Sequence, residues 1–366
     1  MYTHQSLQDI LFLMLYGGTA MLALATGIYL WLRRSNAIAP DVTSLKTLRH
    51  WTAGFLITAA LSHVWWYVLG VYWLTDDRMV RNITAVTLDH ITLIPLVMAI
   101  MFRMLQDRQR WIWPWLMTQV PVIVVAAMGI AQHNQNTLDI MHYWEVAVII
   151  IFIVYYIYAL IRYGRWLHEN YADLEHKEVW QSLLIVVTLF IIYEIYSTNP
   201  GRMTQEYLAQ VNTIVIIFFL LWRVETLQKL DVKEETASDT QVEDDNTYTM
   251  SSNIGSLLQT HCESQQLYLQ HDLTLQQLAM AIGTNRTYLS AYFAQQGTTF
   301  NAYINHLRID YFIRLYHESI TSARPVRAIQ LAQQSGFHSY STFAAAFKQF
   351  NGLTVTAWMK SQTPDS

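Results

Sequence analysis

Six polar residues stand inside long apolar stretches of the first 225 residues. They are His63, Asp89, His90, Glu145, Glu194 and Asn212. A charged side chain in hydrocarbon is unfavourable by several kcal/mol unless it is paired or reached by water. With about 1.5 Å of rise per residue, all six fall in the outer half of a helical bundle or at the floor of that half. We therefore predict a polar pocket between helices, open to the outside, that binds a small ligand, a cation or protons.

Other interpretations of these six residues predict different chemistry. They could be shallow side chains that reach water or form hydrogen bonds between helices. Zinc would favour ligands spaced by one helical turn, and no such pair occurs among them. Haem between His63 and His90 would hold two imidazoles at different depths. A retinal Schiff base needs a lysine inside a span, and the spans predicted below contain none. We expect no metal ion and no cofactor.

A second group of candidates belongs to a helix-turn-helix pattern that begins at Thr274. The stretch Thr274-Leu275-Gln276-Gln277 is a capping box, which marks the start of a helix. Gly283 supplies the turn, and residues 285–296 (NRTYLSAYFAQQ) predict the second helix. The apolar stripe of that helix packs inward and leaves one face outward. The outward face carries Thr287, Ser290, Ala291 and Ala294.

The same pattern returns at 325–350. Pro325 suits the first turn of a helix, whose apolar face is Ile329, Leu331 and Ala332, and Gly336 ends it in a left-handed conformation. Ser339 is the expected N-cap of a second helix that extends to Phe350. Its inward stripe is Phe343, Phe347 and Phe350, its outward face is Ser341, Ala345 and Lys348, and Tyr340 and Ala344 flank that face. Apolar residues recurring between Phe300 and Leu315 predict one long amphipathic helix that joins the two patterns.

The second pattern contains Gly336-Phe337-His338-Ser339-Tyr340-Ser341-Thr342-Phe343, followed by Phe347-Lys348 and Gly352-Leu353-Thr354. This arrangement resembles the signature of the AraC/XylS transcription regulators. The resemblance extends back to about Ile254. It implies a fold in which a connecting helix holds two reading heads that face successive major grooves of double-stranded DNA. By this resemblance the base readers match Thr287, Ser290, Ala291, Tyr340, Ser341, Ala344 and Ala345. Arg286 and Lys348 suit phosphates, and Asn285 suits a phosphate or a helix cap.

The chain departs from the family pattern at three positions. Family members often have arginine where this chain has Ala291 and Ala345, and proline where it has Val355. Phosphate contacts supply most nonspecific affinity for DNA. We therefore expect weak binding by a single domain, strengthened by a homodimer or a favourable site.

The elements that must position these residues form two very different parts. Of 366 residues, 53% are hydrophobic and 14% are charged, and the apolar excess lies in the first 225. Seven apolar runs there are long enough, or nearly so, to cross a bilayer as helices. They lie at about 10–32, 51–73, 83–105, 111–131, 142–163, 181–198 and 207–224. The single cysteine, Cys262, excludes an internal disulfide and suits a reducing compartment.

The placement of Lys and Arg predicts the orientation of these spans, because cytoplasmic loops are rich in both. With the N-terminus outside, the inner segments carry Arg33, Arg34, Lys46, Arg49, Arg103, Arg108, Arg110, Arg162, Arg165, Lys177, Arg223, Lys229 and Lys233. The outer segments carry only Arg78, Arg81 and Arg202. The odd number of spans then delivers the C-terminal domain to the cytoplasm, where DNA is.

These observations predict an all-α protein with four parts. They are a seven-helix transmembrane sensor domain (1–225), an acidic cytoplasmic linker (226–250), an AraC-type DNA-binding domain (251–362) and a tail (363–366). The linker is rich in acidic and small polar residues and cannot bury enough surface to fold alone. A repeat of Val224, Leu227 and Leu230 suggests that the last span continues as far as Leu230.

The predicted function is that of a one-component transcription regulator in the inner membrane of a bacterium. Its membrane part, in contact with lipid, would sense a small molecule, an ion or an envelope condition, and its cytoplasmic domain would bind promoter DNA. A second hypothesis is a receptor or transporter whose cytoplasmic domain binds a protein partner, and a third is a membrane enzyme or redox protein. No nucleophile–base pair or Gly-rich phosphate loop indicates catalysis, so we do not expect an enzyme.

Overall fold

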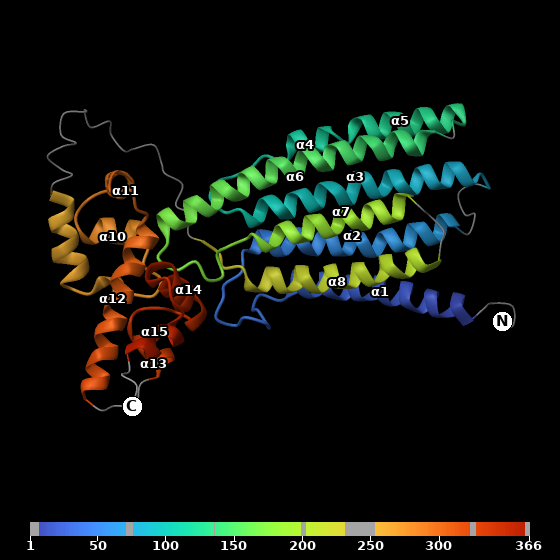
Figure 1. The fold of residues 1–366 in the computed structure, drawn as a ribbon. Helices are drawn as coiled ribbons and strands as arrows, with labels where there is room; N and C mark the ends of the chain where they lie inside the picture. Colours follow the sequence, from blue (N-terminus) through green and yellow to red (C-terminus); the bar gives the residue numbers. More distant parts are fainter. Residues whose placement is uncertain are drawn as a thin grey trace, which may run out of the picture. The chain divides into compact units, whose positions relative to one another are not determined.

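The computed structural model describes residues 7–70, 76–134, 136–198, 203–230, 253–322 and 327–362. The chain divides into two compact units (Figure 1). The N-terminal unit comprises Met1–Tyr163 and Val179–Val232, and the C-terminal unit comprises Gly164–Glu178 and Lys233–Ser366. Within the described residues every regular element is helical, and β pairing is limited to two isolated bridges. The all-α fold class is confirmed.

The N-terminal unit is built from antiparallel helices that pack side by side (Figure 1). They are α1 (Leu7–Leu32), α2 (Lys46–Gly70), α3 (Arg78–Met104), α4 (Trp113–Met117), α5 (Val120–Gln132), α6 (Thr137–Asn170), α7 (Gln181–Thr198) and α8 (Met203–Thr226). The part of α6 after Tyr163 belongs to the C-terminal unit. In the described residues each predicted apolar run is helical over most of its length, and the fourth is divided into α4 and α5. The end of the second run, residues 71–73, lies outside the described residues. A proline opens each of these two helices, as expected for a residue that lacks the N–H group.

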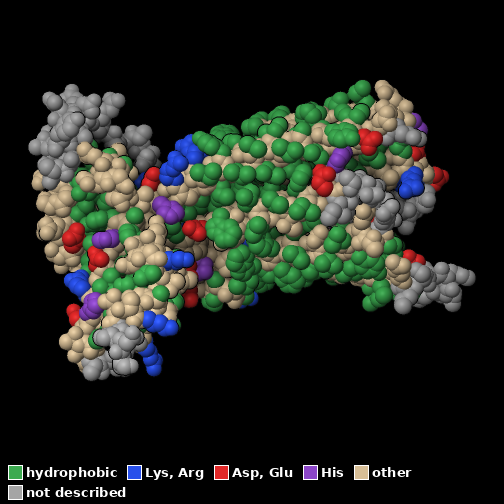
Figure 2. Space-filling model, in the orientation of Figure 1, with side chains coloured by type: hydrophobic (Ala, Val, Ile, Leu, Met, Phe, Trp, Pro, Cys, Tyr) green, Lys and Arg blue, Asp and Glu red, His purple; other side chains and the backbone are tan. Residues whose placement is uncertain are grey.

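Five of these helical segments are long and apolar enough to cross a membrane. They are Gln8–Leu32, Arg78–Met104, Trp113–Gln132, Thr137–Asn170 and Met203–Thr226. The apolar part of α7, Gln181–Ile192, is shorter, and the described part of α2 is not among these candidates. Hydrophobic side chains cover most of the face of this unit that Figure 2 shows, and Met14, Met21 and Ile151 are more than half exposed. A water-soluble protein does not expose an apolar surface of this extent, so the unit suits a multi-pass membrane protein.

The end of α8 is fixed by a buried carboxylate. Glu225 has no exposed surface, and its Oε2 accepts hydrogen bonds from the backbone N–H groups of Ala37 and Ile38, each at 2.9 Å. Its Oε1 accepts from the Tyr29 hydroxyl and lies 4.0 Å from Nη1 of Arg49. These partners hold the loop between α1 and α2 against the last turn of α8.

The helix does not continue to Leu230 as the repeat of apolar residues suggested. It ends at Thr226, after which Gln228 forms an isolated antiparallel bridge with Ser44. The Lys229 N–H donates to the Thr43 carbonyl oxygen at 2.7 Å. Tertiary pairing therefore replaces the helical hydrogen bonds here. The predicted linker beyond Leu230 lies outside the described residues, as does the tail.

The C-terminal unit contains two helix-turn-helix heads and a connecting helix. Its elements are η2 (Leu258–Glu263), η3 (Leu267–Leu269), α10 (Leu275–Ala281), α11 (Arg286–Gln295), α12 (Phe300–Thr321), α13 (Ala328–Gln334), α14 (Tyr340–Asn351) and α15 (Val355–Gln362). The capping box of Thr274 and Gln277 is present at the start of α10. Pro325, the expected start of α13, lies outside the described residues.

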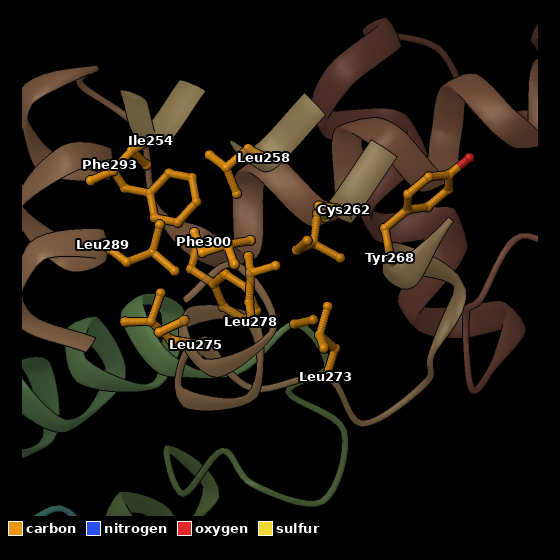
Figure 3. Packing of buried hydrophobic residues seen from close by; sticks show 14 residues of the cluster. Ile254, Leu258, Cys262, Tyr268, Leu273, Leu275, Leu278, Leu289, Phe293 and Phe300 are labelled. Carbon is orange, nitrogen blue, oxygen red and sulfur yellow. The ribbon is translucent and has the colours of Figure 1, made fainter. Parts of the chain in front are cut away.

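Each head has its own hydrophobic core, and α12 contributes to both. Phe300 and Ile304, at the start of α12, belong to the core of the first head. Figure 3 shows this core, in which Leu289 and Phe293 of α11 pack toward Phe300. Phe312, two turns farther along α12, lies 4.4 Å from Phe343 of α14 between ring centroids, in the core of the second head. The connecting helix therefore fixes the spacing of the two heads.

Two residues predicted to face the core of the second head do not. Ile329 is 57% exposed and Phe350 is 39% exposed. Both lie in terminal turns, Ile329 in the first turn of α13 and Phe350 in the last turn of α14. Phe350 packs against His306 with ring centroids 5.3 Å apart. The helical stripe continues past the edge of the core, so periodicity alone overestimates burial there.

Candidate nucleic-acid interface

The first candidate reading helix is α11, which begins at Arg286. Asn285 is its N-cap, and the Asn285 side chain accepts a hydrogen bond from the Tyr288 N–H at 2.8 Å. This observation favours the capping role for Asn285 over a phosphate contact. Among the predicted outward positions, Thr287, Ala291 and Ala294 are exposed and Ser290 is half-buried.

The second candidate reading helix, α14, begins after its N-cap Ser339. Ser339 Oγ accepts from the Thr342 N–H at 3.3 Å. Phe343 and Phe347 have no exposed surface, which turns the opposite face of α14 outward. On that face Ser341, Ala345, Lys348 and Tyr340 are exposed, and Ala344 is half-buried. The base and phosphate contacts of both helices stay predictions.

The two turn glycines have the same backbone conformation but different surroundings. Gly283 has a φ of 75° and Gly336 a φ of 89°, both in the left-handed region. A Cβ at Gly283 would meet nothing within 4 Å, whereas a Cβ at Gly336 would lie 2.8 Å from Cα and 2.9 Å from O of Leu269. Gly336 is therefore needed both for its conformation and for the close approach of the preceding segment.

Arg308 of α12 is a buried structural cation, and no local sequence pattern distinguishes it from the exposed basic residues of the domain. It is 1% exposed, and its Nε donates to the Tyr268 carbonyl oxygen at 2.7 Å. Its Nη2 donates to the carbonyl oxygens of Gln270 at 2.7 Å and His271 at 3.2 Å. Burial lowers the pKa of Arg308 to about 10, so the guanidinium remains charged at neutral pH. Arg308 therefore holds the segment 268–271 against α12, and its burial leaves it no surface for a phosphate contact.

In the N-terminal unit, the predicted pocket residues take part in bonds between helices. Asp89 of α3 accepts hydrogen bonds from Ser62 Oγ at 2.6 Å and Trp66 Nε1 at 2.7 Å, both on α2. His63 Nε2 lies 3.1 Å from Gln210 Oε1 on α8. The polar partners Ser62, Trp66 and Gln210 were not among the predicted residues, although the first two flank His63 in the sequence.

His90 follows Asp89 but faces other helices. Its Nδ1 lies 3.8 Å from Oε1 of Glu145 on α6, and Glu145 has no exposed surface. With its amide nitrogen toward Glu145, Gln119 donates to the same Oε1 at 3.0 Å. Glu194 on α7 and Asn212 on α8 are half-buried.

Among the predicted residues, the structure brings His90 and Glu145 together, whereas Asp89 and His63 bond to residues that were not predicted. Asp89 lies against α2 and His90 against α6, and His63 bonds toward α8. In the described part of the chain, no three His, Cys, Asp or Glu side chains are grouped to hold a metal ion. The bonds between helices match the alternative in which these residues hold the bundle together, and a ligand site among them stays a prediction.

Comparison with known proteins identifies the C-terminal heads. A family model described as a helix-turn-helix domain matches residues 264–361, and the domain is of the AraC type. No curated protein and no solved structure matches the chain. A domain of this type implies DNA binding.

Proposed function

We propose that the chain is a membrane-bound, one-component transcription regulator of the bacterial inner membrane. Its C-terminal domain binds promoter DNA, and its N-terminal helices sense a small molecule, an ion or an envelope condition. One observation carries the proposal: an AraC-type domain and five long apolar helices occur in a single chain. A protein with both domains in one chain connects an event at the membrane to DNA without a separate messenger.

The proposal includes seven spans, with α2 and α7 crossing beside the five longer segments. The N-terminus is then outside, and the C-terminal domain is in the cytoplasm. The excess of Lys and Arg in the inner segments supports this orientation. A reporter enzyme that works only in the cytoplasm should be active when it is fused after Leu230. A reporter that works only in the periplasm should be inactive at the same position, and its activity would contradict the orientation.

DNA binding is tested with the full chain in lipid nanodiscs and DNA from upstream of its own gene. A mobility shift at low salt should resist excess unrelated DNA. Thr287→Asp and Ser341→Asp place a negative charge on the exposed faces of α11 and α14 and should each abolish the shift. Gln265→Asp introduces the same charge at an exposed position outside the reading helices and should leave the shift unchanged.

Two results would lead away from this function. Loss of binding in all three variants would indicate a general effect of charge. Absence of any shift at low salt, for the wild type and for the variants Asn170→Ala and Glu175→Gln of the next subsection, would favour the hypothesis of a receptor or transporter with a protein partner.

A further inference from the structure

Residues 164–178, here called the strap, belong to the C-terminal unit and comprise the last turns of α6 and most of the segment that leads from α6 to α7. Ala172 of the strap has no exposed surface and lies in the core of the first head. Its N–H donates to the Leu273 carbonyl oxygen at 3.1 Å. The Asn301 amide donates to the carbonyl oxygens of Tyr171 at 3.1 Å and Ala172 at 2.8 Å. The strap is therefore packed into the DNA-binding domain as part of its structure.

On either side of this anchor, the strap contacts both candidate reading helices. Asn170 Oδ1 accepts a hydrogen bond from Nε of Arg286, the first residue of α11, at 2.9 Å. Glu175 Oε2 accepts from Oγ1 of Thr342, in the first turn of α14, at 3.4 Å. The neighbouring residues Thr287 and Ser341 are predicted base readers. The strap thus reaches the N-terminal end of each reading helix.

Further bonds fix the position of Glu175. The Asp173 side chain accepts from the Glu175 N–H at 3.0 Å, which closes a tight turn. Lys177 Nζ lies 3.4 Å from Asp272 Oδ1 and 5.7 Å from the centroid of the Tyr171 ring. The turn before Glu175 and the ion pair after it hold the carboxylate near α14.

The chemistry of these contacts resembles that of a DNA backbone. Helix N-termini attract anions, and phosphate oxygens accept hydrogen bonds there from N–H groups and cationic side chains. The strap supplies an amide oxygen to Arg286 and a carboxylate to Thr342. Its acidic residues are Glu169, Asp173, Glu175 and Glu178, against Arg165 and Lys177. Strap oxygens and phosphate oxygens cannot occupy the same places.

We propose that the strap is an internal competitor of DNA, which must leave Arg286 and Thr342 before both heads can bind. This inference rests on the proposed function. Helix α6 ends at Asn170, the residue that holds Arg286, so a displacement of α6 acts directly on one of the two contacts. A signal that shifts α6 would thereby change the affinity for DNA by favouring the released arrangement.

The first test measures DNA affinity of the full chain in nanodiscs by fluorescence anisotropy. Asn170→Ala removes the acceptor of Arg286 and should tighten binding about fivefold, the equivalent of one ordinary hydrogen bond. Glu175→Gln replaces the charged acceptor of Thr342 by a neutral and weaker one, and should tighten binding by a smaller factor. Glu169→Gln removes the same charge as Glu175→Gln from a strap residue for which the structure gives no contact with a reading helix. That control should bind as the wild type does.

The second test locks the strap in place. A chain with Glu175→Cys and Thr342→Cys is treated with a short, reducible thiol crosslinker, with Glu175→Cys alone as the control. Cys262, the natural cysteine, is buried and should not react. The linked protein should lose DNA binding by at least tenfold and recover it on reduction, whereas the single variant should keep it throughout.

The outcomes separate the inference from the function on which it rests. Failure of the pair to link, DNA binding by the linked protein, or equal affinity of the wild type, Asn170→Ala and Glu175→Gln would each overturn the competitor role. If no variant, released or locked, binds DNA at low salt, the proposed function is wrong and the inference with it.

Discussion

Lys348 is the one basic residue of α14, and it is exposed. Lys348→Ala should weaken DNA binding and lower the slope of log affinity against log salt by about one, because one phosphate contact is lost. Affinity of the full chain measured across a salt series checks this. Lys360→Ala removes the same charge from the end of α15 and should not change the slope. An unchanged slope in Lys348→Ala would show that Lys348 does not contact phosphate.

Cys262 lies in the core of the first head, where burial raises the pKa of its thiol to about 12. The native protein should therefore resist iodoacetamide at pH 8 and react only when denatured, because the thiolate is the nucleophile. Mass spectrometry of the alkylated protein measures the extent of reaction. Rapid labelling of the native chain would mean that this core opens readily.

The same pKa shift predicts how stability depends on pH. The folded thiol keeps its proton up to about pH 12, whereas the unfolded thiol loses it near pH 9.0. The unfolded state therefore binds fewer protons above pH 9, and the free energy of unfolding should fall as pH rises through this window. Cys262→Ala should lessen the fall, as judged by denaturant unfolding at pH 8 and pH 10. An identical fall in both proteins would assign it to other groups.

Among the elements, the turns of the two heads offer a matched comparison. Gly336→Ala should destabilise the domain more than Gly283→Ala. Both substitutions place an alanine in a left-handed backbone conformation, which is unfavourable by about 1–2 kcal/mol. Only Gly336→Ala also forces a Cβ against the Leu269 backbone. Overpacking of that kind adds roughly 1–3 kcal/mol.

Denaturant unfolding followed by circular dichroism would compare the two glycine variants with the wild type. Equal loss of stability in both would mean that the segment around Leu269 moves away without cost. In that case the close approach at Gly336 would not be what holds this segment between the heads.

The helices of the heads could be predicted from the sequence because their end signals are local. Thr274, Asn285 and Ser339 cap the helices where expected, and Gly283 and Gly336 adopt the expected turns. The end of α8 could not be predicted in this way, because Gln228 pairs with Ser44, which lies some 180 residues earlier in the sequence. Whether Phe350 is buried likewise depends on where the core ends, which no periodic pattern reports.

At the scale of the whole molecule, the class of each part was predictable, but their connection was not. The apolar runs and the two helix-turn-helix patterns are visible in composition and spacing. The strap carries no such signal: Asn170, Ala172 and Glu175 read as an ordinary polar loop between spans. Only the fold brings them to Arg286, the core and Thr342.

Asp89 tests the sensing part of the proposal. Asp89→Asn should alter the response of a promoter reporter while DNA binding by the purified chain persists, because the bonds from Ser62 and Trp66 hold α2 to α3. Glu194→Gln should act similarly if α7 takes part. Asp139→Asn, near the start of α6, is a control for the loss of charge. An unchanged reporter response in both Asp89→Asn and Glu194→Gln would remove the predicted site.

Helix α6 runs without a break from Thr137 to Asn170, about 50 Å at the usual rise per residue. A continuous helix conveys rotation as faithfully as translation. One alanine inserted before Asn170 would turn the end of the helix by about 100°, whereas four would restore nearly the original angle one turn farther on. Expression of the target gene should then vary with the number of inserted residues, because that number sets the rotation of the end of α6 about the helix axis.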